Sequence, residues 1–448
     1  MNSENQISTR SPQRAASSGW SRWRFRVVAV LLVLLLCTSN SSAYSVLTHE
    51  QVVDLVWTNE LTPLLLKRFP GLTEEQLKEA HGYAYGGAVI QDLGYYPFGS
   101  VQFSNLVHYV RSGDFVRELI LQSQDANEYA FALGALAHYA SDISGHPAVN
   151  QAVSIQFPKL RAKYGNSVRY AEDHTAHLKT EFGFDMVQVA KNRYASAQYH
   201  DFIGFQVSKS LLERTFPIVY GVELKDVLTH EDLAVGSYRF AVSRMIPQMT
   251  QIALRTHEKD MMKENPTFAK KKFLYRLSRS DYEKEWGKDY TKPDFGTRFW
   301  SVLLRYYMPK IGPFRALAFK NPTPQTEEMY FKSINTTIDQ YRIYLQQVGA
   351  GTLELANCDF DTGKETKAAE YILTDEAYAK LLSQLAERKF DKTTPELRDN
   401  ILNFYSDLSL PLETKKDNAR WQSVLASLDQ LKLATPTPVI AASPAKGR

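Results

Sequence analysis

The chain of 448 residues is 44% hydrophobic and 23% charged, with 22 Gly and 19 Pro, which is close to the average for globular proteins. This composition excludes disordered, collagen-like and coiled-coil chains, and the length favours two to three domains. The net charge of +4 comes from the first 43 residues, because the rest of the chain holds 48 basic and 48 acidic residues. We therefore expect no nucleic-acid partner, since such partners usually need a basic surface.

The N-terminal segment has the order of a secretory signal peptide. Three arginines precede an apolar run of eleven residues, Val27–Cys37, which would cover roughly half of a 30 Å hydrocarbon core. Ser41 and Ala43 fit the small-residue rule for cleavage. We predict a signal peptide over residues 1–43, a secreted or periplasmic chain that begins at Tyr44, and, as the weaker alternative, an uncleaved membrane anchor.

Helical periodicity dominates the remainder and predicts a mainly α fold. Residues 73–76 have capping-box spacing, residues 394–395 place a helix cap before a proline, and residues 421–431 show one apolar helix face. The stretch from Thr352 to Asp361 is instead typical of a strand. After signal cleavage the remaining thiol is Cys358, so we expect no internal disulfide.

Histidine use divides the chain more sharply than charge does. Seven of the ten histidines fall within residues 49–177, so we expect the chemistry to lie in the first half. We predict a helical domain over residues 44–258, an appended mainly helical region over 259–434, and a disordered Pro- and Ala-rich tail over 435–448.

The central signal is the segment from Ala137 to Pro147. His138 and Asp142 are four residues apart, so on a helix they share one face and can bind one cation. The preceding residues are apolar nearly all round, which indicates a buried helix whose His and Asp need a partner. Pro147 disfavours helical geometry at His146, so we expect that imidazole at the helix end.

Further donors have compatible spacing. His177 and Glu181 form a second pair four residues apart, and Asp92, His108 and His49 lie upstream. A mixed nitrogen and oxygen set without thiolates suits Zn²⁺ in a hydrolytic site. Each pair taken alone is also consistent with a surface ion pair or a hydrogen-bonded core contact.

In this order the residues resemble the bacterial zinc-dependent phospholipase C family, whose fold also occurs in zinc-dependent single-strand nucleases. The resemblance covers about residues 44–185. It implies three zinc ions, held respectively by Asp92, His108, His138 and Asp142; by His146, His177 and Glu181; and by the Tyr44 terminus and His49 with Asp142 as a bridge.

Two features depart from the family pattern. Tyr44 stands where the family usually has Trp, and only four residues separate Asp142 from His146, a shorter spacing than usual. His174 is therefore an alternative to His146 as a ligand.

The resemblance implies an exported phospholipase C acting on glycerophospholipid headgroups, in which a zinc-activated water attacks phosphorus. Asp92 would act as a ligand or as the general base. The alternatives are a nuclease or phosphatase of the same fold, and a non-catalytic helical binding protein stabilised by metal.

Two surface features bear on the substrate, which we expect to be a phospholipid or another phosphodiester. Aromatic residues around Asp92 form an aromatic wall that either binds a choline-type ammonium, stacks a nucleobase or packs in the core: Tyr83, Tyr85, Tyr95, Tyr96, Phe98 and Phe103. The basic cluster at residues 270–279 either contacts lipid headgroups at a membrane surface or is a solvated helix face. No protein partner is predicted.

Overall fold

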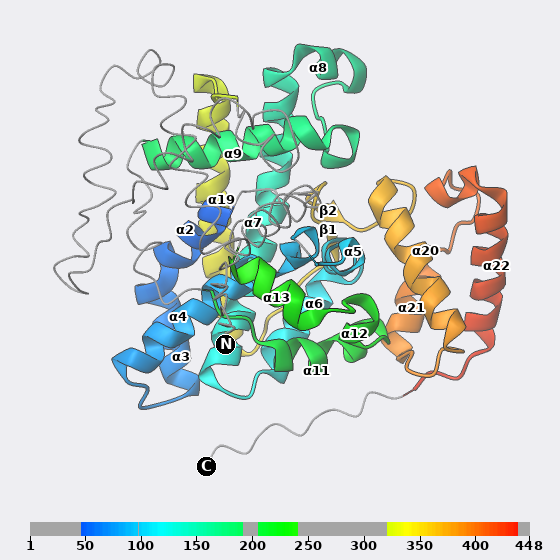
Figure 1. Cartoon of the computed structure of the whole chain (residues 1–448), viewed down its shortest axis with the longest axis horizontal. Coiled ribbons are helices and arrows are strands. Elements are labelled where there is room, and N and C mark those ends of the chain that lie inside the picture. The colour runs from blue at the N-terminus through cyan, green and yellow to red at the C-terminus, as the bar shows by residue number, and fades with distance from the viewer. Residues whose placement is uncertain (1–45, 97, 191–204, 241–319, 438–448) are drawn as a thin grey trace, which may run out of the picture.

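The computed structural model describes residues 46–96, 98–190, 205–240 and 320–437, and their fold is mainly α, as predicted (Figure 1). The signal peptide, Tyr44, the boundary at residue 258 and the basic cluster at 270–279 lie outside the described residues. They remain predictions. Among the described helices, none is long and apolar enough to span a bilayer.

The first half of the chain is a series of helices. They are α2 (Val46–Val56), the π-helix η1 (Trp57–Leu61), α3 (Thr62–Arg68), α4 (Glu74–Ala88), the 3₁₀ turn η2 (Ile90–Tyr95), α5 (Val101–Tyr109), α6 (Ser112–Gln122), α7 (Ala126–Gln156), α8 (Pro158–Tyr164), η3 (Tyr170–Glu172) and α9 (His174–Ala190). Three more follow the first gap: α11 (Lys209–Tyr220), α12 (Leu224–Val227) and α13 (Glu231–Phe240).

The C-terminal part adds a long helix, a short hairpin and a group of helices. These are α19 (Pro324–Ala350), β1 (Cys358–Asp359), β2 (Lys364–Glu365), α20 (Ile372–Glu387), α21 (Pro395–Phe404), the 3₁₀ turn η6 (Glu413–Lys416) and α22 (Asn418–Leu433). In Figure 1, α20 to α22 lie together at one edge, whereas α19 runs beside α7 in the middle of the molecule.

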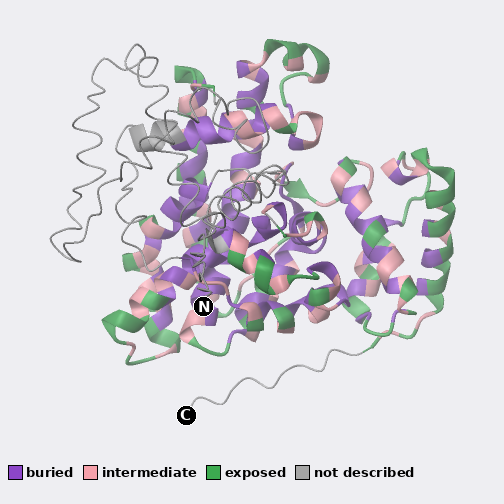
Figure 2. Ribbon diagram, viewed as in Figure 1, coloured by how far each residue is buried: buried purple, intermediate pink, exposed green. Residues whose placement is uncertain are grey.

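Helix α7 is the centre of the fold. It is buried over most of its length (Figure 2), with α4 and α19 both packed along it. The crossing with α4 is very close, because a Cβ at Gly134 would lie 2.0 Å from the Ala84 carbonyl oxygen. A Cβ at Gly87 would likewise lie 1.9 Å from the Phe131 oxygen. These two glycines let the backbones meet.

The expectation that His146 sits at a helix end is wrong. Helix α7 continues through Pro147 to Gln156. Pro147 has no N–H to donate to the Ile143 carbonyl, but extensive packing around this helix outweighs the local cost. His146 therefore lies four residues after Asp142 on the same helical face.

The predicted helix caps are present. Thr73 and Gln76 form a reciprocal capping box before α4, and the Thr394 hydroxyl accepts from the Leu397 N–H before α21. In α22 the buried apolar residues follow helical spacing, at Val424, Leu428 and Leu431. These elements follow from local sequence because capping needs only nearby residues.

The predicted strand is mostly absent. Only Cys358–Asp359 pairs with Lys364–Glu365, and residues 352–357 have no regular structure. A helix side chain, in place of a partner strand, takes up a backbone hydrogen bond of this segment. The Tyr139 hydroxyl donates to the Ala356 carbonyl oxygen at 2.8 Å. The Cys358 thiol is buried and unbridged, as expected.

The predicted tail begins in contact with the fold. Thr437 donates its N–H to the Thr393 oxygen at 2.8 Å and its hydroxyl to the Asp391 oxygen at 2.7 Å. Thr437 is therefore held by two backbone carbonyls, and residues 438–448 lie outside the described residues.

The close crossing of α4 and α7 can be tested with a matched pair of glycine variants. Gly134→Ala should lower the free energy of unfolding by about 1–3 kcal/mol, because the new methyl meets backbone. Gly236→Ala on α13 meets nothing within 4 Å and should be neutral or stabilising by up to about 1 kcal/mol. Urea unfolding of both variants checks this, and equal midpoints would contradict the packing.

Candidate metal centre

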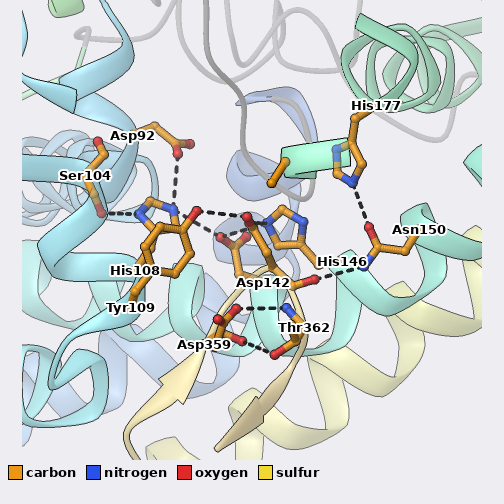
Figure 3. A network of polar contacts seen from close by, with 12 residues as sticks. Asp92, Ser104, His108, Tyr109, Asp142, His146, Asn150, His177, Asp359 and Thr362 are labelled. Carbon is orange, nitrogen blue, oxygen red and sulfur yellow. Dashed lines mark hydrogen bonds and ion pairs between the residues drawn. The ribbon is translucent and has the colours of Figure 1, made fainter. Parts of the chain in front are cut away.

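The centre is built around Asp142. Its Oδ2 lies 3.0 Å from His138 Nε2, 3.6 Å from His108 Nε2 and 3.7 Å from His146 Nε2. Its Oδ1 lies 3.5 Å from His49 Nε2. Helices α2, α5 and α7 thus bring four imidazoles to one carboxylate, and all five side chains are buried. Figure 3 shows two of these imidazoles, His108 and His146, beside Asp142.

These separations fit ligands better than hydrogen bonds. Two donor atoms bound to one tetrahedral zinc at about 2.0–2.2 Å are roughly 3.3 Å apart. Among the described residues, His108 Nε2, His138 Nε2 and both Asp142 oxygens accept or donate no well-formed hydrogen bond. Buried polar atoms in this state are costly, and a divalent cation would satisfy them together.

Hydrogen bonds behind the imidazoles set their tautomers. His108 donates from Nδ1 to the Ser104 carbonyl at 2.8 Å, and His138 donates from Nδ1 to the Ala88 carbonyl at 2.9 Å. Because a carbonyl only accepts, each Nδ1 carries a proton, so each ring in its neutral form presents the lone pair of Nε2 to the centre. This arrangement is typical of metal-binding histidines. The close approach of α4 supplies the Ala88 carbonyl.

A second group of donors lies where α9 meets α7. His177 Nδ1 is 2.7 Å from Glu181 Oε1, and its Nε2 donates to Asn150 Oδ1 at 2.9 Å. The His146 ring stacks at 5.5 Å on the His177 ring. Asn150 therefore turns the lone pair of His177 Nδ1 toward Glu181 and His146.

The described residues contain three donor sets whose atoms lie within 4.8 Å of one another: His49, His138 and Asp142; Asp92, His108 and His138; and His146, His177 and Glu181. Eight of the nine predicted ligands are thus brought together, while Tyr44 lies outside the described residues. His174 is exposed, its ring contacts the Tyr170 ring, and it belongs to none of these sets. The geometry favours His146 over His174.

Asp92 reaches the centre from a different direction. It lies in η2, is 2% exposed, and places Oδ1 3.5 Å from His108 Nε2. The 3₁₀ turn and the start of α5 are tied together, because the Ser104 hydroxyl donates to the Gln91 oxygen at 2.5 Å. The turn that carries Asp92 is therefore fixed against the helix that carries His108.

Burial and neighbouring charges perturb the imidazoles in opposite ways. Burial, with the nearby His138, lowers the pKa of His49 to about 3, and burial beside His146 lowers the pKa of His177 to about 3. For His108, burial opposes protonation, but contacts with Asp142 and Asp92 raise its pKa to about 10. In the metal-free chain, His108 therefore keeps its second proton at neutral pH and is an imidazolium.

The predicted aromatic wall divides into two kinds of residue. Tyr85, Tyr95 and Phe103 are buried, which supports core packing for these three. Phe98 is 52% exposed with a φ of 64°, in the loop that joins η2 to α5. A positive φ is unusual for an aromatic residue, and strained residues of this kind cluster at functional sites as well as in turns.

Two residues near the centre are absent from the sequence-based set. Asn150 lies on α7, one turn after His146, but an asparagine has no distinctive ligand spacing. Asp361 lies in the turn of the β1–β2 hairpin, with Oδ1 3.2 Å from His146 Nε2. Sequence analysis placed Asp361 at the end of a predicted strand, and nothing in the local sequence indicated the helix that it contacts.

His81, which had no predicted role, is paired within the fold. Its Nε2 lies 3.0 Å from Asp54 Oδ1, and its ring stacks at 3.8 Å on Trp57. Its acid partner is 27 residues away, beyond helical spacing.

The fold and the donors define a class: a mainly α protein with a buried metal centre of imidazoles and carboxylates. Within it, residues 48–229 match the model of a family described as zinc dependent phospholipase C. This match confirms the resemblance predicted from the order of the ligands, and this segment of the chain is similar to zinc-dependent phospholipase C. Searches among curated proteins and among solved structures find no match.

Zinc uptake by the metal-free protein should release protons at neutral pH, and His108 should contribute one of them. Zinc needs the lone pair of Nε2, whereas the Asp142 and Asp92 carboxylates keep that nitrogen protonated without metal. Affinity should therefore rise with pH, about tenfold per unit for each displaced proton. Calorimetry in buffers of different ionisation enthalpy measures the release, and a heat independent of the buffer would contradict it.

Proposed function

We propose that this protein is an exported, zinc-dependent phosphodiester hydrolase, a phospholipase C that acts on glycerophospholipid headgroups with three zinc ions. The observation that carries the proposal is the convergence of eight buried donors within the segment that matches the family. Bound zinc would polarise a phosphodiester and activate water, as hydrolytic zinc does generally.

The donors have different roles in this proposal. Asp142 contacts four imidazoles through both oxygens, so it is suited to bridge two cations. Asp92 approaches His108 from the side, on a separate turn. We assign Asp92 as a ligand that also takes the proton from the attacking water, because its carboxylate lies at the edge of the cluster.

The loop between Asp92 and His108 supports a lipid substrate. It presents Phe98, whose ring is about half exposed, next to the turn that carries Asp92. An exposed aromatic residue beside a buried site suits contact with acyl chains or with a headgroup ammonium. This contact would be peripheral and needs no membrane-spanning helix.

The start of the described chain supports a role for the exported terminus. Val46 and Leu47 are buried, and the Leu47 N–H donates to Asp185 Oδ2 at 3.2 Å. His49, three residues after Val46, lies in the centre. Because Tyr44 precedes His49 by five residues, cleavage after Ala43 would put the new amino group within the reach of the chain from the centre.

The proposal is tested by metal content and by turnover. The purified exported protein should contain about three zinc ions and cleave phosphatidylcholine, and a chelator should abolish the activity. His146→Gln should lose zinc and at least about 100-fold of the activity, whereas His174→Gln should retain both. Zinc is measured by atomic emission and phosphocholine release by mass spectrometry.

A panel of substrates separates the alternatives. Cleavage of single-stranded DNA in preference to phosphatidylcholine would identify a nuclease and contradict the lipid substrate. Stoichiometric zinc without turnover of either substrate or of a generic phosphodiester would support a metal-stabilised binding protein. Equal zinc and activity in the His146 and His174 variants would remove His146 from the centre.

The role of the terminus has its own test. A chain released at Tyr44 should bind one zinc more than the same chain released with a Gly-Ser extension, because the extension moves the free amine away from His49. N-terminal sequencing confirms the start, and zinc analysis gives the difference. The same zinc content in both chains would contradict the proposed terminal ligand.

A further inference from the structure

The turn of the β1–β2 hairpin enters the metal centre from the C-terminal part of the chain. Phe360 donates its N–H to the His108 carbonyl at 3.2 Å, and its ring packs edge-on at 5.2 Å against the His108 ring. Phe360 is fully buried, and it also contacts the rings of His138 and Tyr139. The hairpin is therefore part of the wall around the imidazoles.

Contacts with α7 and α20, and a hydrogen bond within the turn, hold this turn in place. Asn150 on α7 donates its Nδ2 to the Asp361 carbonyl at 2.8 Å. Asp359 accepts the Thr362 N–H at 3.0 Å and the hydroxyl of Thr374 on α20 at 2.5 Å (Figure 3 shows Asp359 and Thr362). These bonds leave the turn little freedom to move.

The turn also needs a glycine where it meets α7. Gly363 has a φ of +68°, and a Cβ there would lie 2.5 Å from the Ile143 carbonyl oxygen and 2.7 Å from Pro147 Cγ. Pro147, which donates no hydrogen bond to Ile143, thus lies where the hairpin approaches the helix. Pro147, which does not end α7, therefore forms part of the surface that the hairpin contacts.

The carboxylate of Asp361 is oriented by two phenols. Tyr109 donates its hydroxyl to Oδ2 at 2.8 Å, and Tyr371 donates to the same oxygen. Oδ1 is the oxygen that faces His146, at 3.2 Å from Nε2. The Asp361 side chain is 2% exposed, so this acid is buried against the centre.

We propose that Asp361 is a further ligand of the zinc bound by His146, so that the C-terminal region completes the metal centre. This inference rests on the zinc centre of the proposed function. The 3.2 Å separation of Oδ1 from Nε2 is close to the roughly 3.3 Å expected for two ligand atoms on one tetrahedral zinc. No hydrogen bond of good geometry joins His146 Nε2 to a described residue, which leaves its lone pair for a cation.

Charge balance supports the assignment. His146, His177 and Glu181 offer one negative charge against the two positive charges of Zn²⁺, which leaves a net charge in a buried site. Uncompensated buried charge is costly. The Asp361 carboxylate supplies the second negative charge, while Asn150 links it to His177 by accepting from the imidazole and donating to the Asp361 carbonyl.

The test compares Asp361→Asn with the wild-type chain. The amide keeps the shape and an acceptor for the tyrosines but removes the charge. Zinc affinity at one site should fall about 10- to 100-fold, and transfer of one zinc to a chromogenic chelator should accelerate in proportion. Asp361→Glu, which keeps the carboxylate, should restore much of the retention.

Two controls separate a ligand from a structural anchor. Asp359→Asn, in the same hairpin, should leave zinc retention unchanged, because its bonds go to Thr362 and Thr374. The metal-free Asp361→Asn protein should melt close to the metal-free wild type, so that the difference between them is seen only with zinc.

Three results would overturn the inference. If the wild type binds zinc and Asp361→Asn retains it equally well, the inference would be overturned while the proposed function would stand. An equal drop in the melting temperature with and without zinc, and normal zinc affinity, would make Asp361 an anchor of the hairpin. A wild-type chain that takes up no zinc would overturn the inference and the proposed function together.

Discussion

The structure depends on a cluster of imidazoles around one carboxylate in the protein interior, where burial of such polar groups is unfavourable unless they are bound. Four imidazoles surround the Asp142 carboxylate, and every one of these side chains is buried. Without a cation, their desolvation is poorly repaid, since the separations are mostly too long for hydrogen bonds. A divalent cation converts the same arrangement into a stabilising one, so metal binding and folding are coupled here.

The backbone around the cluster is arranged to serve it. Glycines at the crossing of α4 and α7 bring the Ala88 carbonyl to His138, while the first turn of α5 presents the Ser104 carbonyl to His108. These carbonyls orient the imidazoles before any cation arrives. Pre-orientation of this kind lowers the entropic cost of binding and sharpens the geometry.

The C-terminal part is joined to the same centre. Helix α19 packs along α7, and its Tyr341 donates to the Leu133 carbonyl at 2.8 Å. The hairpin after α19 then places Phe360 and Asp361 against the imidazoles. This region therefore contributes to the site as well as to the core, and its helices α20 to α22 extend from that contact.

Local sequence determined a large part of this protein. Helical periodicity, the Thr73 and Thr394 caps, and the pairs His138 with Asp142 and His177 with Glu181 all depend on residues within one or two turns, so they were predictable. The tertiary structure alone decided the rest. Packing lets α7 continue through Pro147. A hydrogen bond from a helix side chain takes the place of a partner strand at Ala356, and Asp361 lies beside His146 although 215 residues separate them in the sequence. Such contacts depend on how distant elements pack, which neither spacing nor composition records.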